Sequence, residues 1–167
     1  SNVLELLFML DAARRASANR VIAVVPYFGY ARQDRKDEPR VPISARVLLD
    51  LMNVVGINRI MAMDLHSPQI QGFINTPFDH LYSSMALFDR LKELNLNFEN
   101  GVVLAPDVGS AKISQSYAKR LGVGFALIDK RRPKPNEAKV AHIVGELRDK
   151  HVIIIDDMID TAGTICN

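Results

Sequence analysis

Residues 152–164 read VIIIDDMIDTAGT, and this stretch decides the fold class of the chain. Its four β-favouring apolar residues, 152–155, predict a buried strand that runs directly into carboxylates. The turn of small residues that follows can aim backbone N–H groups outward, joined by the hydroxyls of Thr161 and Thr164, which is the chemistry of a phosphate cradle. Carboxylates repel phosphate, but they accept hydrogen bonds from sugar hydroxyls and hold Mg²⁺ through oxygen. Acids beside a phosphate cradle therefore predict a ribose-phosphate site.

The same stretch has a structural alternative, namely a strand that ends in an Asx turn with Asp160 or Thr161 capping a helix. The full order of strand, acid, acid, two residues, acid and Thr-Ala-Gly-Thr is more specific than that. It resembles the phosphoribosyl-diphosphate-binding motif of the type I phosphoribosyltransferase fold. Phosphoribosyltransferases share that motif with ribose-phosphate diphosphokinase, which is also called phosphoribosyl-diphosphate synthetase or ribose-phosphate pyrophosphokinase. The resemblance leaves the reaction open and implies that ribose 5-phosphate binds to Asp156, Asp157, Asp160, Thr161, Ala162, Gly163 and Thr164.

The composition is that of a globular protein. Hydrophobic residues make up 48% of the chain and charged residues 24%, so a substantial core is available and disorder is not expected. A net charge of +2 is too small to argue for a general polyanion binder, and no nucleic-acid partner is expected. The sole cysteine, Cys166, cannot form an internal disulfide, which fits a reducing compartment. The apolar runs are too short for a membrane span or a secretory signal, and the predicted location is the cytoplasm.

Both ends of the chain predict a fragment of a longer protein. The chain lacks an initiating Met and begins inside a helix-like pattern of apolar residues. It stops at Asn167, where the predicted phosphate loop should begin a helix.

Strand and helix patterns alternate along the chain. Helices are expected over 2–18, over 44–55 with Gly56 as C-cap, over 84–95 and over 111–121. Strands are expected over 20–27, 58–65, 102–105, 123–129 and 151–156, and polar loops over 29–42 and 130–136. The segment 140–148 fits either a helix or a strand. This alternation predicts parallel strands covered by helices, with ligands beyond the C-terminal ends of the strands.

A faint internal repeat indicates two similar halves, with chance as the alternative explanation. The pattern strand–Pro–x–x–Gly occurs as VPYFG (25–29) and again as APDVG (105–109). Together with the resemblance, it implies an α/β fold of the type I phosphoribosyltransferase kind, built from two incomplete halves with parallel sheets covered by helices. Residues 1–83 are then part of an N-terminal domain on the ATP side, and residues 84–167 part of a C-terminal domain on the ribose 5-phosphate side.

Residues 26–37, PYFGYARQDRKD, combine an aromatic start with many hydrogen-bond donors, which suits a nucleotide. A solvated surface loop is the alternative. The segment resembles the ATP-binding region of ribose-phosphate diphosphokinase, and the similarity continues through MDLHSPQIQGF (63–73) and PDVG (106–109). Phosphoribosyltransferases that act on bases are not expected to carry these upstream segments. The resemblance implies that Arg32 and Gln33 bind ATP.

The histidine in the second of these segments, His66, is by residue type alone more often structural than a ligand. The resemblance implies instead that His66 and Asp107 are associated with Mg²⁺ and the ATP phosphates, with Asp64 as an auxiliary metal contributor. Because Mg²⁺ prefers oxygen, His66 binds the ion directly, orients a metal-bound water or contacts phosphate, and the sequence does not choose among these roles.

A basic loop, KRRPKP (130–135), follows the predicted strand at 123–129. A hydrated surface and a weak nucleic-acid patch are alternatives, and the flanking prolines without interleaved aromatics weaken the second. The position resembles the catalytic flexible loop of the diphosphokinase family. Lys130 and Arg132 are then the implied catalytic residues, which close over the reaction and stabilise charge on the leaving phosphate. Arg131 and Lys134 are secondary candidates.

Taken together, the resemblance covers essentially the whole chain and implies ribose-phosphate diphosphokinase. In that reaction the 1-hydroxyl of ribose 5-phosphate attacks the β-phosphorus of MgATP, and phosphoribosyl diphosphate for nucleotide biosynthesis is formed with AMP. The chemistry needs charge neutralisation and in-line positioning more than a protein nucleophile. The family usually forms homo-oligomers with active sites near subunit interfaces.

Two departures and two alternatives qualify this interpretation. Ser110 stands where a second Gly is expected in many relatives, which affects the backbone near Asp107. The N-terminal and C-terminal parts of the family fold are absent, so the fragment alone is expected to have little or no turnover.

The alternatives are a base phosphoribosyltransferase and a non-catalytic regulatory homologue of the synthetase. Retention of Lys130, Arg132, Asp156 and Asp157 argues against the second.

Overall fold

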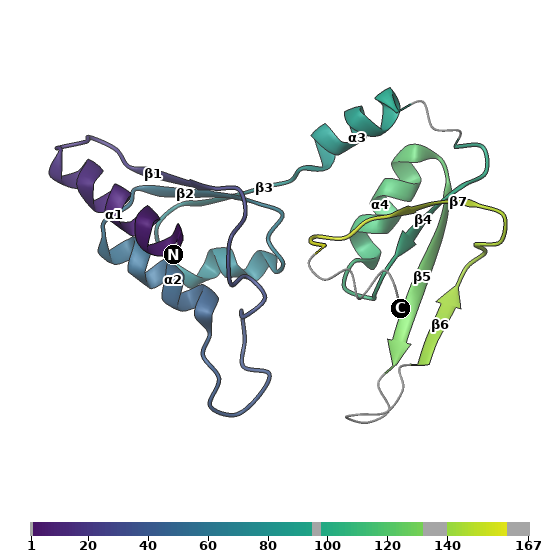
Figure 1. Cartoon of the computed structure of the whole chain (residues 1–167), viewed down its shortest axis with the longest axis horizontal. Helices are drawn as coiled ribbons and strands as arrows, with labels where there is room; N and C mark the ends of the chain where they lie inside the picture. The colour runs from purple at the N-terminus through teal and green to yellow at the C-terminus, as the bar shows by residue number, and fades with distance from the viewer. Residues whose placement is uncertain (1, 95–97, 132–139, 160–167) are drawn as a thin grey trace. The chain divides into compact units, whose positions relative to one another are not determined.

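The structure is a computed structural model of the chain, and it describes residues 2–94, 98–131 and 140–159. The chain divides into two compact units, Ser1–Phe88 (unit 1) and Asp89–Asn167 (unit 2). Each unit contains its own β-sheet with parallel strands (Figure 1). The division falls inside helix α3 (Ser84–Glu93), whose first residue is the boundary that the sequence predicts.

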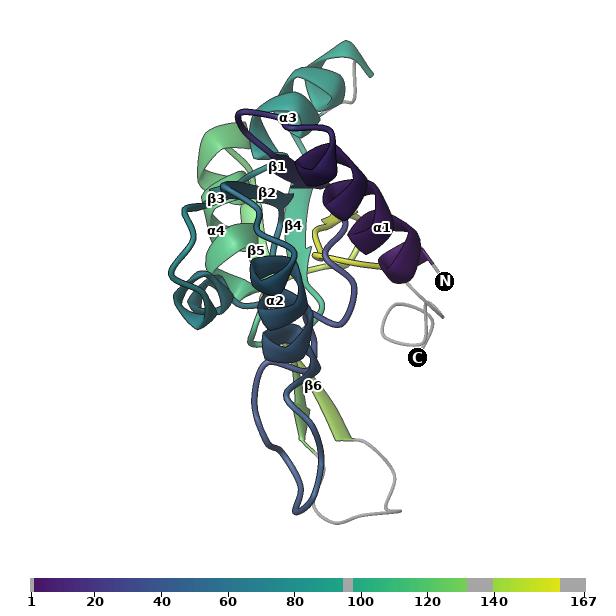
Figure 2. The same cartoon turned by 90° about the vertical axis from the view of Figure 1, so that its left-hand side faces the viewer.

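Unit 1 is built around a three-stranded parallel sheet with the order β1-β2-β3. Its elements are α1 (Asn2–Arg15), β1 (Ile22–Val25), α2 (Ser44–Val54), β2 (Arg59–Met63), the 3₁₀ helix η1 (Pro68–Phe73) and β3 (Phe78–Leu81). Figure 1 shows α1 and α2 on the same side of these strands, and Figure 2 shows the two helices side by side.

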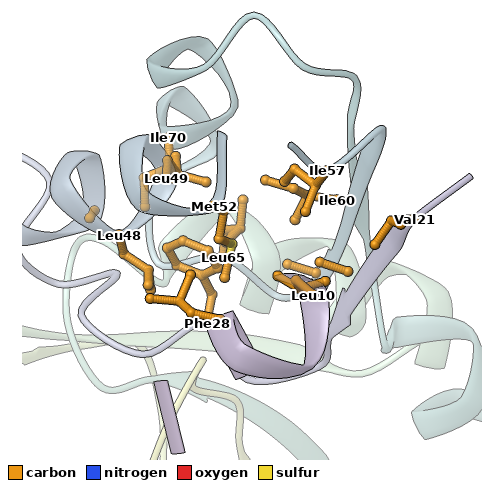
Figure 3. Packing of buried hydrophobic residues seen from close by; sticks show 14 residues of the cluster. Leu10, Val21, Phe28, Leu48, Leu49, Met52, Ile57, Ile60, Leu65 and Ile70 are labelled. Carbon is orange, nitrogen blue, oxygen red and sulfur yellow. The ribbon is translucent and has the colours of Figure 1, made fainter. Parts of the chain in front are cut away.

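The core of unit 1 lies between these helices and one face of the sheet. Successive side chains of a strand point to opposite faces, so Ala23 of β1 is buried while Ile22 and Val24 are exposed. On the helix side, Leu49 and Met52 of α2 are completely buried. Figure 3 shows this cluster, whose buried members are Leu7, Leu10, Val21, Ala23, Phe28, Ala45, Leu48, Leu49, Met52, Ile57, Ile60, Ala62, Leu65 and Ile70.

Helix α2 ends at Val54, one residue before the predicted bound, and the prediction of Gly56 as its C-cap is wrong by one position. Its C-cap is Val55, and Gly56 follows with φ of 84°, a left-handed conformation that glycine adopts without a Cβ penalty. The Gly56 N–H donates to the carbonyl oxygen of Asn53 at 3.0 Å and so satisfies one of the last carbonyl groups of the helix. This stop directs the chain into β2.

Unit 2 contains a four-stranded sheet with the order β6-β5-β4-β7. Its elements after α3 are β4 (Gly101–Ala105), α4 (Ala111–Leu121), β5 (Gly124–Arg131), β6 (Val140–Val144) and β7 (His151–Ile154). Strand β4 pairs in parallel with both β5 and β7, whereas β6 pairs antiparallel with β5.

Strand β4 is the buried centre of unit 2. All five of its residues are buried, as expected for a parallel strand covered on both faces. Helix α4 packs against β4 and β5, and Tyr117 is its largest buried side chain. On β4 and β5, Val102, Leu104 and Ala126 form a cluster with Ile128 and Leu147. A buried central strand holds the residues at its C-terminal end in a fixed position.

The predicted α/β class with parallel strands is confirmed, and most elements lie where the sequence places them. Helix α4 has the predicted bounds, and the segment 140–148 contains strand β6. Strand β3 and helix η1 were not predicted. The prediction that the basic loop begins at residue 130 is wrong, because β5 continues through Arg131 and is held there by pairing with β6. Within the described residues, no helix combines the length and apolarity needed to cross a membrane.

Candidate functional site

The carboxylates predicted to bind ribose 5-phosphate follow the C-terminal end of β7. Strand β7 pairs in parallel with β4, with Leu104 opposite Ile154. The two strands therefore end at the same edge of the sheet, where Asp107 follows β4 and Asp156 follows β7. Ligand sites of open α/β sheets lie at this edge. The structure thus brings together two carboxylates that are almost 50 residues apart in the sequence.

The electrostatics of Asp156 show that negative charge is concentrated at this edge. Burial raises the pKa of Asp156, and the neighbouring carboxylates of Asp157 and Asp107 raise it further. The Asp157 N–H donates to Oδ1 of Asp156 at 2.9 Å and works in the opposite direction, since it favours the charged form. The net effect raises the pKa. The ionised Asp156 carboxylate is therefore repelled by its acidic neighbours. A hydrogen-bond donor or a cation bound at the site relieves this repulsion.

Asp107 itself is fixed by a tight turn that leads into α4. The Ser110 N–H donates to Oδ1 of Asp107 at 2.9 Å, and the Ser110 hydroxyl donates to the Asp107 carbonyl oxygen at 3.0 Å. A Cβ at Gly109 would lie 3.3 Å from Oδ1 of Asp107, so a glycine there leaves the carboxylate its room. Ser110 is therefore not a disturbance of the turn, because its hydroxyl adds a bond that glycine lacks.

We expect Ser110→Ala to lower the free energy of unfolding by about 1 kcal/mol, because it removes a partly buried hydroxyl bond. Ser110→Gly is expected to cost roughly another 0.5–1 kcal/mol through backbone entropy. Urea unfolding of the chain measures both changes. Ser116→Ala is the matched control, since Ser116 is exposed on the same helix. Equal stability of the Ser110 and Ser116 variants would contradict the role of the hydroxyl.

The predicted ATP-binding residues Arg32 and Gln33 lie in the loop between β1 and α2, and both are exposed. The loop is held through its backbone. The Gln33 N–H donates to the Tyr30 carbonyl oxygen at 2.9 Å, and the Gln33 carbonyl oxygen accepts from the Ala45 N–H at 3.2 Å. This second bond ties the loop to the first turn of α2. The side chains of Arg32 and Gln33 are thereby presented outward from an anchored backbone.

Asp64 and His66 lie in the loop directly after β2, which we call the 64–66 loop. The side chain of Leu65 between them is buried in the core of unit 1 (Figure 3). The Asp64 carboxylate accepts a hydrogen bond from the Ser83 N–H at 3.2 Å, and the His66 side chain is exposed. One buried residue flanked by two polar ones orients the loop, because the core fixes Leu65 and leaves its neighbours at the surface.

The predicted metal residues His66, Asp64 and Asp107 are divided between the two units, so their joint role in binding a metal ion stays a prediction. Across residues 2–94, 98–131 and 140–159, no three side chains of His, Cys, Asp or Glu gather closely enough to hold a metal ion. Asp64 and His66 belong to unit 1, and Asp107 belongs to unit 2. The chemistry of the donors nevertheless fits Mg²⁺, since Asp64, Asp107 and Asp156 offer carboxylate oxygens.

Two family models match the chain. Residues 1–56 match the N-terminal domain of ribose phosphate pyrophosphokinase, and residues 82–167 match the phosphoribosyl transferase domain. The chain belongs to the ribose-phosphate pyrophosphokinase family. Both matches agree with the resemblance found in the sequence motifs, and they cover the loop after β1 and the ends of β4 and β7.

Curated and solved members of the family resemble the chain over nearly its whole length. The ribose-phosphate pyrophosphokinase of Chlorobaculum tepidum is 54% identical over 166 residues, which are 99% of this chain and 51% of that protein. The Helicobacter pylori (strain 26695) protein of the same name is 52% identical over 165 residues, 99% of this chain and 51% of that protein. The crystal structure of phosphoribosylpyrophosphate synthetase from Mycobacterium smegmatis matches with a TM-score of 0.86 and 41% identity, covering 98% of this chain and 52% of that chain. The chain spans about half the length of the relatives it matches.

Several of the predicted site residues lie outside the described residues. They are Arg132, Asp160, Thr161, Ala162, Gly163 and Thr164, so the phosphate loop stays a prediction. The backbone of Lys130 is described, and it pairs with Ala141 of β6.

Sequence reasoning missed one residue beside the predicted ATP side of this family member, namely His80 of β3. Its Nε2 accepts a hydrogen bond from the Leu65 N–H at 3.0 Å, so it contacts the 64–66 loop directly. Burial lowers the pKa of His80, against the opposing influence of the Asp64 charge. The ring also packs on Tyr82, with centroids 4.3 Å apart. The only sequence signal is a histidine next to a short apolar run, which does not stand out.

Proposed function

We propose that the protein containing this chain is a ribose-phosphate diphosphokinase. It transfers diphosphate from MgATP to the 1-hydroxyl of ribose 5-phosphate and produces phosphoribosyl diphosphate and AMP. The observation that carries the proposal is the pairing of β4 with β7, which sets the Asp107 and Asp156 carboxylates at one edge of the sheet within a chain of this family. Sequence identity of 54% to a ribose-phosphate pyrophosphokinase over 99% of the chain supports it.

The acids of unit 2 suit the sugar. Asp156 and Asp157 accept hydrogen bonds from ribose hydroxyls, and those bonds relieve the repulsion that raises the pKa of Asp156. Residues 160–164 receive the 5-phosphate through backbone and hydroxyl donors, as the family motif implies. Unit 2 is accordingly the ribose 5-phosphate side of the proposed enzyme.

The donors of unit 1 suit the nucleotide. Arg32 and Gln33 are exposed on an anchored loop and bind ATP through hydrogen bonds or stacking. Asp64 and His66 organise the phosphate end, either directly or through metal-bound water. Asp64 in this unit, like Asp107 and Asp156 in unit 2, is a carboxylate that would hold Mg²⁺, and the bound ion would supply neutralisation of the phosphate charge. Unit 1 is accordingly the ATP side.

The reaction then needs positioning and charge stabilisation. The oxygen of the sugar 1-hydroxyl forms a bond to the β-phosphorus of ATP, and the bond from that phosphorus to the α,β-bridging oxygen breaks. The bridging oxygen leaves with AMP, and the hydroxyl proton passes to solvent. Lys130 and Arg132 stabilise the charge that develops on the phosphates. We further propose a cytoplasmic homo-oligomer whose active sites are shared between subunits, as is usual in the family.

Incubation of a full-length protein that contains these 167 residues with MgATP and ribose 5-phosphate is expected to release AMP in step with phosphoribosyl diphosphate. The isolated chain is expected to show little or no turnover, because it spans only about half the length of its relatives. A coupled AMP assay measures both. Diphosphate release that requires a base and no ATP would establish the base phosphoribosyltransferase instead. Absence of turnover in the full-length protein would favour a regulatory homologue.

A further inference from the structure

Three hydrogen bonds fasten the 64–66 loop to the end of β3 and the residues that follow it. The Leu65 N–H donates to Nε2 of His80 at 3.0 Å, and the Asp64 N–H donates to the Leu81 carbonyl oxygen at 2.9 Å. The Ser83 N–H donates to the Asp64 carboxylate at 3.2 Å. Of the three acceptors, only the imidazole of His80 is a neutral side chain. The Leu65 amide, between the two predicted site residues, is therefore held by one particular ring.

The ring of His80 is held in a defined protonation form. For Nε2 to accept the Leu65 N–H, the single proton of the neutral imidazole must sit on Nδ1. Nδ1 is buried and has no hydrogen-bond partner among the described residues. A buried N–H without a partner is destabilising, so Nδ1 does not contribute to the stability of the fold. The bond to Leu65 is the interaction that a histidine provides here and an apolar side chain does not.

The neighbours of His80 show that the position faces the apolar side of the sheet. In the β2–β3 register His80 lies opposite Ala62, which is 2% exposed. Two residues earlier on the same face, Phe78 packs against the core of unit 1. An apolar residue would suit this surrounding, and the chain instead has a polar ring bonded to the loop between two predicted site residues.

We infer that His80 is a positioning residue for the ATP side, which sets the direction of Asp64 and His66 by fixing the Leu65 amide between them. The inference rests on the proposed function, and it assigns His80 no contact with substrate. Loss of the Nε2 acceptor leaves the Leu65 N–H unpaired and lets the loop backbone rotate. Asp64 and His66 then meet the nucleotide in a less favourable geometry, while the ribose 5-phosphate side in unit 2 is untouched.

The test compares His80→Phe with His80→Gln in a full-length protein that contains this chain. Phe fills the space without an acceptor, whereas the Gln side-chain oxygen replaces Nε2 as acceptor. We expect His80→Phe to raise KM for MgATP about tenfold and to change KM for ribose 5-phosphate by less than about twofold, as fits the loss of one partly buried hydrogen bond. His80→Gln is expected to restore KM for MgATP to within about threefold of the starting protein.

His151→Phe is the matched control, because His151 is exposed at the start of β7, at the edge of unit 2 opposite to Asp156. It is expected to leave both KM values unchanged. A purely structural role for His80 would lower kcat and thermal stability without separating the two KM values, and that result would overturn the inference. Failure of His80→Gln to rescue would overturn it as well. If the starting protein forms no AMP, the proposed function fails first, so the two failures are distinguishable.

Discussion

Asp156→Asn is expected to raise the thermal stability of the protein while it lowers turnover about a hundredfold. Burial and the carboxylates of Asp157 and Asp107 raise the pKa of Asp156 in the folded state. A carboxyl group whose pKa is higher when folded binds its proton more tightly in that state. Its ionised form therefore destabilises the fold at neutral pH, and the destabilisation disappears as the pH falls below the pKa of the unfolded chain. Asn keeps the shape and removes the charge.

The same charge is what the proposed sugar site requires, which is why stability and activity move in opposite directions. Thermal unfolding at several pH values should show a gain in Tm at neutral pH that shrinks toward acidic pH, where Asp156 is protonated in both states. Asp149→Asn is the matched control, because Asp149 is exposed before β7 in a left-handed conformation that Asn also tolerates. A lower Tm for Asp156→Asn, or a loss of turnover below about threefold, would contradict the assignment.

The position of Asp107 beside Asp156 could be predicted from the sequence. Each residue directly follows a short apolar run, and parallel strands end at one edge of a sheet. The sequence could not supply the order of the strands. That β7 pairs with β4, and that β6 runs antiparallel beside β5, follows from tertiary packing between segments far apart in the chain. In β6 the apolar residues Ile143 and Val144 are adjacent, and both are exposed. The sequence of this segment therefore lacks the alternation of apolar and polar residues that marks a half-buried strand.

Strand β3 was missed for a related reason. It has only four residues, Phe78–Leu81, and two of them are polar. What holds it in place lies elsewhere in the chain. Asp79 pairs with Arg59 of β2 at 2.7 Å, and His80 accepts from Leu65. Because these contacts arise only when the two strands meet, the local pattern carries no sign of them. The contribution of His80 to the site was hidden together with the strand that carries it.

The loops predicted to bind ATP show the opposite case, in which the motif lies where a ligand site of a parallel sheet is expected. Gln33 and His66 were selected from sequence motifs, and both lie in loops that follow the C-terminal ends of parallel strands. The motifs did not reveal how these loops are anchored. The bond from the Ala45 N–H to Gln33 and the burial of Leu65 depend on α2 and on the core of unit 1, which are not part of either motif.

Lys130→Ala is expected to lower kcat of the full-length protein by about 10²–10³-fold, with KM for either substrate changed by less than about threefold. Strand β5 continues past Leu127, which pairs with the last residue of β4, and its backbone is held by β6 as far as Arg131. Lys130 therefore lies on a supported extension of β5 beyond the strand end that Asp107 follows. A cation supplied there contributes mainly when charge moves onto the leaving phosphate, which is why the effect falls on kcat.

Lys130→Arg separates the role of charge from that of the side chain as a whole. It keeps the cation but changes its shape, so partial recovery, to within about 10-fold of the starting kcat, is expected if electrostatic stabilisation dominates. Lys119→Ala is the matched control. Lys119 is exposed in the last turn of α4, and its substitution removes the same charge from the same unit. Unchanged kcat in Lys130→Ala would remove Lys130 from the catalytic assignment. An equal fall in Lys119→Ala would show that net charge, not the extension of β5, determines the rate.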